Sequence, residues 1–422
     1  MATTAPTVSD TCAAAKRASR TLATLPSGVK DAALEAIAAA IEERADEVLE
    51  TNARDLEAAR EGDYGAAFLD KLRLDRGRVA AMVAGVRKIV SLPDPVGEVI
   101  DGWRLGNGLD IRKVRVPLGV VAVVYEARPN VTIDAAALCL KSGNAIVLRG
   151  SSAAARSNAL LARIAASAAA AAGVPEDAIA FVGGGREDIA ELATQTGSVD
   201  LIVPRGGEGL KESLKGVATV PVIYAASGNC HIYVDSAADL DDAQAIVLNA
   251  KLQRPGVCNA LETLLVNADI AESFLPGVLG ALSEAGVTLH GDDRARAAAG
   301  GVPTDVASDE DWDTEYLALE LAVGVVDSTA EAVAHINAHG SGHSEAIVTR
   351  DTEAARAFQL GVDAACVYVN ASTRFTDGGE FGMGAEIGNS TQKLHARGPI
   401  GLRELCTFKY LIEGDGEIRP AG

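Results

Sequence analysis

Hydrophobic positions along the chain follow two different spacings, and the change between them divides the sequence. Over residues 10–95, apolar residues recur every three or four positions among charged ones, as in "VKDAALEAIAAAIEERADEVLE". This spacing predicts amphipathic helices, and Asp10 is the expected N-cap of the first one. From Val99 onward, short apolar runs such as "VVAVVY" replace it, which is typical of buried strands.

Predicted strands then alternate with predicted helices of ten or more residues, which indicates parallel βαβ units. The sequence predicts two α/β domains of comparable size, with a boundary near Ser227-Gly228-Asn229. The expected strands are "VVAVVY", "AIVLRG", "AIAFVGG", "VDLIVPRGG" and "VPVIYAA" (220–226) in the first domain, and "HIYVD", "LETLLVN", "VTLHG", "AVGVVDS", "EAIVTRD" and "CVYVNAS" in the second.

Two further segments alternate in polarity but adjoin no predicted helix. They are residues 98–115 and the C-terminal segment from 405, which contains "CTFKYLIEG". We expect them to form a small β-flap that serves subunit pairing. The predicted bounds are therefore 1–97 and 116–227 for the first domain, 228–404 for the second, and 98–115 with 405–422 for the flap.

Composition narrows the class of protein. The chain has 422 residues, 38 basic and 58 acidic, with a formal net charge of −20. A field of this sign repels phosphate backbones and anionic lipid, so we expect neither a nucleic-acid nor a membrane partner. No apolar run is long enough to span a bilayer. The six cysteines are scattered and form no zinc or disulfide pattern, which indicates a reducing compartment, the cytoplasm.

Gly-rich turns and clustered histidines are the first candidate sites. "PRGGEGLKE" places Arg205, Gly206 and Gly207 between a predicted strand and a helix, where backbone N–H groups attract phosphate, although a plain tight turn has the same letters. "HINAHGSGH" spaces His335, His339 and His343 four apart. Its glycines interrupt the helix that a metal site would need, so we expect no metal.

Cys258, in "KLQRPGVCNALETLLVN", follows a predicted helix and a Pro-Gly turn. A loop of this kind can present a thiol at a domain edge, and Arg254 could promote the thiolate form. From the residues alone, two interpretations remain open: a buried structural cysteine and a nucleophile.

The order of several motifs carries a resemblance. "VYEARPNVTIDAAALCLKSGNAIVLRG", "VPRGG", "QRPGVCN" and "VYVNASTRFTDGGEFGMGAE" occur in the order found in the aldehyde dehydrogenase superfamily. The chain resembles in particular its glutamate-5-semialdehyde dehydrogenase branch, from about residue 10 to the C-terminus. The resemblance implies an aldehyde-dehydrogenase-like fold of two Rossmann-like α/β domains with a β-flap for oligomerisation.

The resemblance also implies roles for residues. Cys258 becomes the nucleophile, and Asn130 the amide that stabilises the oxyanion. The first domain becomes the NADP-binding domain and the second the catalytic domain. The implied cofactor-binding residues are Arg149, Ser151, Ser152, Arg205, Gly206, Gly207 and Glu315, and an arginine at position 149 suits the extra phosphate of NADPH/NADP. The implied substrate-binding residues are Arg374, Arg128 and Glu126, because the α-carboxylate needs a cation and the α-amine a carboxylate.

One departure from the family pattern is informative. Relatives that oxidise aldehydes to acids carry a glutamate that activates water, and here that position falls on Ala225. Without the base, a cysteinyl thioester must pass to another nucleophile, and inorganic phosphate fits. The resemblance therefore implies NADPH-dependent reduction of L-glutamyl 5-phosphate to L-glutamate 5-semialdehyde in proline biosynthesis.

The resemblance also implies partners for the protein, and alternative functions remain to be compared with the one it implies. We expect a small-molecule substrate, a homo-oligomer, and functional coupling to glutamate 5-kinase, which makes the acyl phosphate. A coenzyme-A-acylating aldehyde dehydrogenase, a cysteine hydrolase or acyltransferase, and a non-catalytic nucleotide-binding scaffold are the alternatives. A hydrolase would need a His-Asp or His-Asn partner for Cys258, and none is evident in the sequence.

Overall fold

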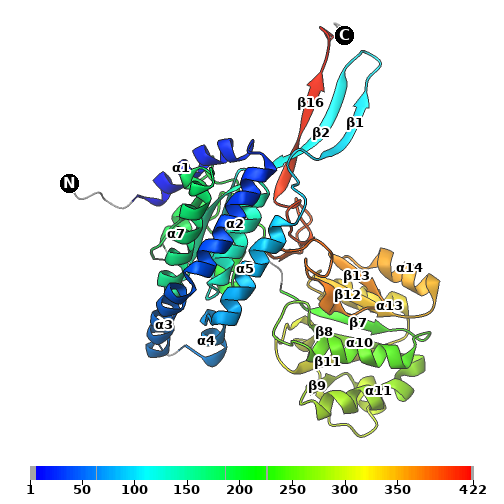
Figure 1. Cartoon of the computed structure of the whole chain (residues 1–422). Coiled ribbons are helices and arrows are strands. Elements are labelled where there is room, and N and C mark those ends of the chain that lie inside the picture. Colours follow the sequence, from blue (N-terminus) through cyan, green and yellow to red (C-terminus); the bar gives the residue numbers. More distant parts are fainter. Residues whose placement is uncertain (1–5, 63, 186, 225–226, 420–422) are drawn as a thin grey trace. The chain divides into compact units, whose positions relative to one another are not determined.

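The computed structural model describes residues 6–62, 64–185, 187–224 and 227–419, and the chain divides into two units that are described separately. Unit 1 extends to Tyr224 and also includes Met383–Gly388 and the chain from Ile400 onward. Unit 2 comprises the intervening residues to Gly382, together with Asn389–Pro399. Figure 1 shows both units with their elements labelled.

Unit 1 is built around a four-stranded parallel sheet with the order β5-β4-β3-β6. Its strands are buried along nearly their whole length, which explains their continuous apolar sequences. In chain order the elements are α1 (Val8–Leu22), α2 (Ser27–Glu43), α3 (Ala45–Glu61), α4 (Ala66–Leu72), α5 (Arg76–Val90), β3 (Val120–Tyr125), α6 (Asn130–Lys141), β4 (Ala145–Gly150), α7 (Ala155–Ala171), β5 (Ile179–Phe181), α8 (Glu187–Ala193), β6 (Leu201–Arg205) and α9 (Glu208–Lys215).

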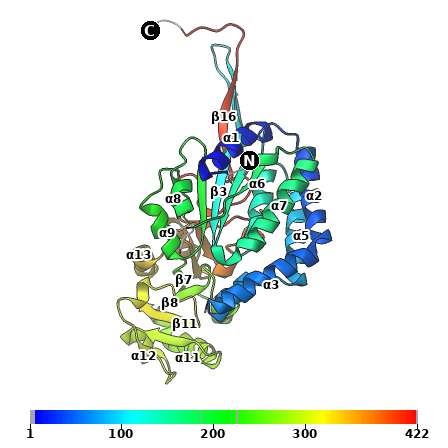
Figure 2. The ribbon, with the colours of Figure 1, turned by 90° about the vertical axis from the view of Figure 1, so that its left-hand side faces the viewer.

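Helices cover both faces of this sheet. α1, α8 and α9 contribute apolar side chains to one core with β3, β4 and β6. α6 and α7 pack on the other face, and α2 and α5 pack against them as an outer layer, as Figures 1 and 2 show. The many alanines of α7 allow this close helix-on-sheet packing.

Two local predictions for unit 1 are wrong. The segment from Val220, expected to be a fifth strand, makes only one isolated bridge, between Ile202 and Val222. Pro221 lacks the N–H that a longer ladder would need, although its carbonyl accepts a hydrogen bond from Ile202 at 2.8 Å. The N-cap of α1 is Thr7, not Asp10, because Asp10 occupies position N3 and completes a capping box.

Three antiparallel strands extend from unit 1 as a separate sheet with the order β1-β2-β16. They are β1 (Val99–Arg104), β2 (Asp110–Pro117) and β16 (Cys406–Glu413), the two segments expected to form the flap. β16 pairs with β2 along its whole length, from Cys406 opposite Pro117 to Glu413 opposite Asp110. β1 and β16 thus form the two edges of this β-flap sheet.

Unit 2 contains a seven-stranded parallel sheet with the order β10-β9-β11-β8-β7-β12-β13. α10, α11 and α12 pack on one face, and α13 and α14 on the other. The elements are β7 (Cys230–Val234), α10 (Leu240–Leu252), β8 (Leu261–Asn267), α11 (Ala268–Glu284), β9 (Thr288–Gly291), α12 (Asp293–Ala298), β10 (Asp305–Val306), β11 (Glu320–Val326), α13 (Thr329–His339), β12 (Ser344–Val348), α14 (Thr352–Gly361), β13 (Cys366–Val369) and the short pair β14 (Asn389–Ser390) and β15 (Gly398–Pro399).

The predicted second domain, residues 228–404, differs from unit 2 at its C-terminal end. Met383–Gly388 and the chain from Ile400 belong to unit 1. The reason is hydrogen bonding: Ile387 N donates to the Ile400 carbonyl at 2.9 Å, and Asn144 Nδ2 donates to the Leu405 carbonyl at 2.8 Å. These bonds link two segments that are distant in sequence within the same unit.

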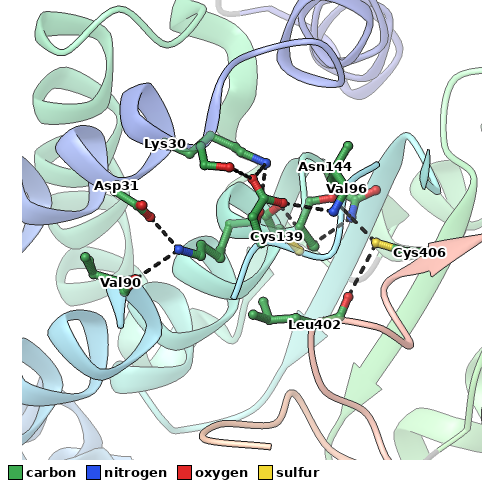
Figure 3. A network of polar contacts seen from close by, with 12 residues as sticks. Lys30, Asp31, Val90, Val96, Cys139, Asn144, Leu402 and Cys406 are labelled. Atoms are coloured by element: carbon green, nitrogen blue, oxygen red, sulfur yellow. Dashed lines mark hydrogen bonds and ion pairs between the residues drawn. The ribbon is translucent and has the colours of Figure 1, made fainter. Parts of the chain in front are cut away.

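A buried polar network connects α2, α6 and the segment before β16 in unit 1 (Figure 3). Lys30 is 1 % exposed, pairs with Asp94 at 2.5 Å and donates to the Lys141 carbonyl at 3.1 Å. Lys141 in turn pairs with Asp31 at 2.5 Å and donates to the Val90 carbonyl at 3.0 Å. Burial would raise the pKa of Asp94, but hydrogen bonds from Lys30 and Ser27 outweigh it and the pKa is lowered.

We predict that Lys30→Met lowers the free energy of unfolding by about 3–5 kcal/mol, because removing one partner leaves Asp94 buried without its cation. Urea denaturation followed by circular dichroism measures this change. The control is Lys88→Met on the exposed side of α5, which should change stability by no more than about 0.5 kcal/mol. Equal effects of the two variants would contradict the role given to Lys30.

Candidate active site

In unit 1 the predicted cofactor residues gather at one edge of the sheet. β3 lies between β4 and β6, so the chain leaves β3 in one direction and later returns on its other side. Such a switch point is where open α/β sheets bind ligands, beyond the carboxyl ends of the strands. Glu126 follows β3, Ser151 follows β4 and Gly206 follows β6.

The loop after β3 leads directly to Asn130, the first residue of α6. Ala127 in this loop has a positive φ of 36°, and its N–H donates to Ser151 Oγ at 3.3 Å, which links the β3 and β4 loops. Arg128 is exposed in the same loop. The side chain of Asn130 is half-buried, and its Nδ2 donates to Asp134 Oδ2 at 2.9 Å, one helical turn later.

Asp134 determines the orientation of the Asn130 amide. Burial raises the pKa of Asp134 to about 6, with Asn130 and Arg205 opposing the shift. Asn130 Nδ2 is the donor in this bond, so the NH₂ end of the amide faces Asp134. One N–H of the Asn130 NH₂ group donates to Asp134, and the other N–H takes no part in this bond.

Arg149 is the last residue but one of β4, and its side chain is only 7 % exposed. Its guanidinium donates to the carbonyls of Gly150 at 2.9 Å and Gly185 at 2.5 Å. Burial lowers the pKa of Arg149, while Asp188 and Glu187 oppose the change. Arg149 thus connects the ends of β4 and β5. Ser152, in a short 3₁₀ turn, is exposed beside it.

The turn between β6 and α9 already binds an anion of the chain itself. The Gly207 N–H donates to Glu126 Oε2 at 3.1 Å, and the Arg205 carbonyl accepts from the Glu126 N–H at 3.1 Å. A Cβ at Gly206 would approach the Glu126 carboxyl carbon at 2.7 Å, whereas Gly207 faces open space. The Gly207 N–H before α9 is therefore occupied by the Glu126 carboxylate.

In unit 2, Cys258 lies half-buried in the loop between α10 and β8. The backbone of Gly228 packs so tightly on this loop that a Cβ there would lie 1.5 Å from the Cys258 carbonyl oxygen. The same oxygen accepts a hydrogen bond from Cys230 Sγ at 3.2 Å. The other five cysteines are buried, so Cys258 is the one thiol with access to solvent.

Glu315 lies on the far side of Gly228. Its Oε1 accepts a hydrogen bond from the Gly228 N–H at 2.7 Å, so the segment before β7 is held between Glu315 and the Cys258 loop. The structure therefore brings together Glu315 and Cys258, two predicted site residues that are 57 positions apart (315 − 258).

The Cys258 loop donates hydrogen bonds to residues 373–376 and accepts one from them. Asn259 Nδ2 donates to the Thr376 carbonyl at 2.9 Å and to the Arg374 carbonyl at 3.3 Å. Thr373 Oγ1 donates to the Asn259 carbonyl at 2.7 Å. Asn259 is buried, so its position and that of Cys258 depend on these bonds.

Arg374 therefore lies close to Cys258. Its Nε donates to Gln253 Oε1 at 2.9 Å, at the start of the same loop. Burial lowers the pKa of Arg374, and the adjacent positive charge of Arg254 lowers it further, while Cys258 and Asp377 raise it. Arg254 belongs to the Cys258 loop and Arg374 is bonded to that loop, and positively charged side chains near a thiol favour its thiolate form.

Several residues of the site escaped the sequence analysis. Asp134, Gly228 and Asn259 are each defined by what they contact rather than by a motif. Asp134 could have been found, because it lies four residues after Asn130 on the same helix, the spacing at which helical side chains meet. Gly228 and Asn259 gave no such signal, since their partners are distant in sequence.

The histidine cluster does not form a metal site. His335 and His339 lie with ring centroids 4.7 Å apart, but His343 Nδ1 is bonded to Ser344 Oγ at 2.7 Å in β12. Burial lowers the pKa of His343 to about 4. Over the ranges that the structure describes, no three His, Cys, Asp or Glu side chains are arranged to hold a metal ion.

The structure bears on neither the missing glutamate nor a membrane-spanning segment in the way it bears on the residues above. Ala225, the position at which the water-activating glutamate is missing, lies outside the described residues. Among the helices that are described, none combines the length and the apolar character needed to cross a membrane.

Comparisons with known proteins show which family the chain is similar to. Residues 1–301 match the model of the aldehyde dehydrogenase family. The gamma-glutamyl phosphate reductase of Thermobifida fusca is 55 % identical over 406 residues, which covers 96 % of this chain and 97 % of the relative. That of Moorella thermoacetica is 55 % identical over 407 residues, covering 96 % and 97 %.

A solved structure gives the same result for the fold. The crystal structure of gamma-glutamyl phosphate reductase from Thermotoga maritima has 42 % sequence identity and a TM-score of 0.96. The match covers 98 % of this chain and all of the other. The predicted fold class, two parallel α/β sheets of the aldehyde dehydrogenase type, is confirmed.

We predict that Gly228→Ala lowers the free energy of unfolding by about 1–3 kcal/mol and changes the alkylation rate of Cys258, because the new methyl group must displace the Cys258 loop. Thermal unfolding and iodoacetamide labelling read by mass spectrometry measure the two effects. In the native protein, Cys258 should be the cysteine that is labelled first.

The matched control for this prediction is Gly280→Ala in α11, where no atom lies within 4 Å of the added Cβ. It should stabilise the helix by up to about 1 kcal/mol and leave Cys258 labelling unchanged. If Gly228→Ala behaves like Gly280→Ala, the close packing at Cys258 does not hold.

Proposed function

The chain belongs to the aldehyde dehydrogenase family, and from this premise we propose that it reduces L-glutamyl 5-phosphate to L-glutamate 5-semialdehyde and phosphate. This reaction is the second step of proline biosynthesis from glutamate. Relatives that are 55 % identical over nearly the whole chain bear the name gamma-glutamyl phosphate reductase. That identity favours this reaction over a coenzyme-A-acylating dehydrogenase and over a cysteine hydrolase or acyltransferase.

The observation that carries the proposal is the setting of Cys258. It is the one cysteine of the chain that is not buried, it lies on a loop fixed by Gly228 and Asn259, and two arginines accompany it. A positive neighbourhood favours the thiolate, the form of cysteine that attacks carbonyl carbon.

In the first step, the Cys258 thiolate attacks the acyl carbon of the substrate. The bond from that carbon to the phosphate oxygen breaks, phosphate leaves with the electron pair, and a thioester forms on Cys258. Negative charge develops on the carbonyl oxygen during the attack, and we assign its stabilisation to Asn130 and to the Cys258 backbone N–H. The bond from Asn130 to Asp134 supports this role because it keeps the NH₂ end of the amide fixed.

The second step reduces the thioester, for which a nicotinamide cofactor, when bound, would supply the hydride. The resulting tetrahedral centre then collapses, returns the thiolate of Cys258 and releases the semialdehyde. Asn130 would stabilise the oxyanion of this centre as it does in the first step.

The edge of the unit 1 sheet fits a dinucleotide. It is a switch point, and its β6–α9 turn holds the Glu126 carboxylate where a pyrophosphate would accept the same N–H bond. We assign the pyrophosphate to Arg205, Gly206 and Gly207. Glu315, fixed at Gly228, would hold the ribose of the nicotinamide end.

We infer that NADPH is the preferred cofactor. The charge of Arg149 at this edge, with the hydroxyl groups of Ser151 and Ser152 beside it, suits an additional phosphate on the adenine ribose. Asp188 and Glu187 lie close enough to Arg149 to affect its pKa and reduce this advantage.

The amino-acid end of the substrate requires a cation for its α-carboxylate and a carboxylate for its α-amine. Arg128 is exposed after β3 and remains our candidate for the first role, and Arg374 a second one. Glu126 remains the candidate for the amine, although its carboxylate is bonded to Gly207 here.

We further propose a homo-oligomer paired through the β-flap, a cytoplasmic setting, and functional coupling to the kinase that makes the acyl phosphate. The flap exposes large apolar side chains, among them Trp103 at 41 % and Ile412 at 59 %, on a sheet with two open edges. Exposed apolar strands of this kind require a partner strand. The six free cysteines agree with a reducing compartment.

The experiment that tests the function uses the reverse reaction. In phosphate-free buffer, the semialdehyde and NADP⁺ should give a burst of about one NADPH per active site and then stop at the thioester. Added phosphate or arsenate should restore continuous turnover, because Ala225 leaves no base for hydrolysis and general-base catalysis contributes about 10²–10⁴-fold.

Cys258→Ala should abolish this burst while NADPH binding, followed by fluorescence, persists. A burst that remains in this variant, or steady production of glutamate without phosphate in the original protein, would contradict the mechanism.

For the cofactor, we predict that Arg149→Leu weakens NADPH binding about tenfold or more and NADH binding much less, since a charge-assisted contact of about 1.5–3 kcal/mol is removed. Fluorescence titration with both cofactors measures the ratio. The control is Arg163→Leu on the exposed face of α7, which should change neither affinity. An equal loss for both cofactors would mean that Arg149 acts only by holding Gly185.

For the assembly, we predict that Ile412→Asp reduces the mass measured by analytical ultracentrifugation, because a charge on the open edge opposes strand pairing. Leu360→Asp is the control, since Leu360 is 77 % exposed in α14 of unit 2, whereas the flap belongs to unit 1. A protein that is monomeric before any substitution would refute the proposed role of the flap.

A further inference from the structure

The loop that carries Cys258 also carries a pair of cations. Arg374 reaches this loop at both ends: its side chain bonds to Gln253 at 2.9 Å, and its carbonyl accepts from Asn259 at 3.3 Å. Arg254 and Cys258 lie between those two contacts in the sequence. The Arg374 guanidinium is thereby held beside Gln253, the neighbour of Arg254 in sequence, and the Arg374 backbone lies beside Asn259, the neighbour of Cys258.

The charges of this segment affect one another. The positive charge of Arg254 lowers the pKa of Arg374, so the two guanidinium groups repel each other. Asp377 is the carboxylate that opposes this effect, but its Oδ1 also accepts the Gly379 N–H at 2.7 Å in a turn. Two neighbouring cations of this kind form a favourable site for an anion with two or more charges.

The chemistry at Cys258 indicates which anion that is. The phosphate of the substrate is joined through one oxygen to the carbon that Cys258 attacks, so it must leave from a point next to the sulfur. The α-carboxylate is separated from that carbon by the whole substrate chain. Arg254 belongs to the loop that carries the sulfur and Arg374 is bonded to that loop, so these cations are better placed for the phosphate than for the carboxylate.

We propose that Arg254 and Arg374 form the phosphate-binding site of the reaction, and that Arg374 is not the ligand of the α-carboxylate. This inference rests on the proposed function and assigns a substrate group to two residues of that site. The pair holds the leaving phosphate in the reductive direction and the attacking phosphate in the reverse direction.

The reverse step is a simple exchange at the acyl carbon. A phosphate oxygen forms a bond to the thioester carbon, the bond from carbon to Cys258 Sγ breaks, and the thiolate leaves with its electron pair. The products are the acyl phosphate and free Cys258 thiolate, and the phosphate proton goes to solvent. No oxidant or reductant enters this step.

The test measures the burst and the steady state separately in Arg254→Gln and Arg374→Gln. The burst of NADPH, made before phosphate enters, should keep an amplitude of about one per active site. The KM for phosphate should rise about tenfold or more, while the KM for the semialdehyde changes less than about threefold. Arg374→Lys, which keeps the charge but loses the planar fork, should give an intermediate KM for phosphate.

Folding of the variants is expected, because Asn259 binds the carbonyl groups of residues 374 and 376 and not the arginine side chain. The matched control is Arg296→Gln on α12, an arginine of unit 2 that pairs with Asp293 and should change neither constant.

Other outcomes are equally decisive. A raised KM for the semialdehyde with an unchanged KM for phosphate would overturn the proposal and return Arg374 to the carboxylate. A lost or slowed burst together with an unchanged KM for phosphate would also overturn it, because the arginines would then act on the thiolate alone. If the unaltered protein gives no burst at all, the proposed function fails, which is distinguishable from a failure of this site.

Discussion

The position of Cys258 depends above all on the hydrogen bonds between Asn259 and residues 373–376. A loop between a helix and a strand is ordinarily one of the more mobile parts of a domain. Here the buried side-chain amide of Asn259 donates to the carbonyl groups of Arg374 and Thr376, and the backbone carbonyl of Asn259 accepts from Thr373 Oγ1 at 2.7 Å. Gly228 packs against the other side of the loop, with its N–H bonded to Glu315. The loop is thus fixed from two sides, and the arginine that accompanies the thiol is part of the same fixation.

In unit 1, too, hydrogen bonds fix the polar groups of the candidate site, here at the carboxyl edge of a buried parallel sheet. The sheet itself offers no chemistry, because its strands consist of apolar side chains that face helices on both sides. Chemistry begins where each strand ends, with Glu126 after β3, Ser151 after β4 and Gly206 after β6. Anions already present in the chain mark these positions: the Glu126 carboxylate binds the Gly207 N–H, and the Asp134 carboxylate binds the Asn130 amide. Both units therefore separate a rigid core from a polar edge that is held by few, specific bonds.

Errors in the sequence analysis arose where a local pattern competed with a contact made elsewhere. "VPVIYAA" has the composition of a strand, but Pro221 cannot donate, and Val222 makes a single bridge. Asp10 is a good N-cap residue, yet Thr7 three residues earlier takes that position and Asp10 reinforces it. The end of the predicted second domain was misplaced because Asn144, more than 250 residues earlier, bonds to the Leu405 carbonyl. In each case the missing information was the identity of a hydrogen-bond partner.

By itself, the sequence determined the alternation of strands and helices, the presence of two α/β units and the strands of the β-flap, and it singled out Cys258 as a candidate nucleophile. These follow from apolar periodicity and from motifs, which are local properties of a chain. Only the tertiary structure decided that the five other cysteines are buried, that Gly228 admits no side chain, that Asp134 binds the Asn130 amide, and that Arg374 is bonded to the loop that carries Arg254 and Cys258. These depend on distances between residues far apart in the chain or on which face of an element is covered. No spacing in the sequence records such distances, because they are fixed only when the elements pack.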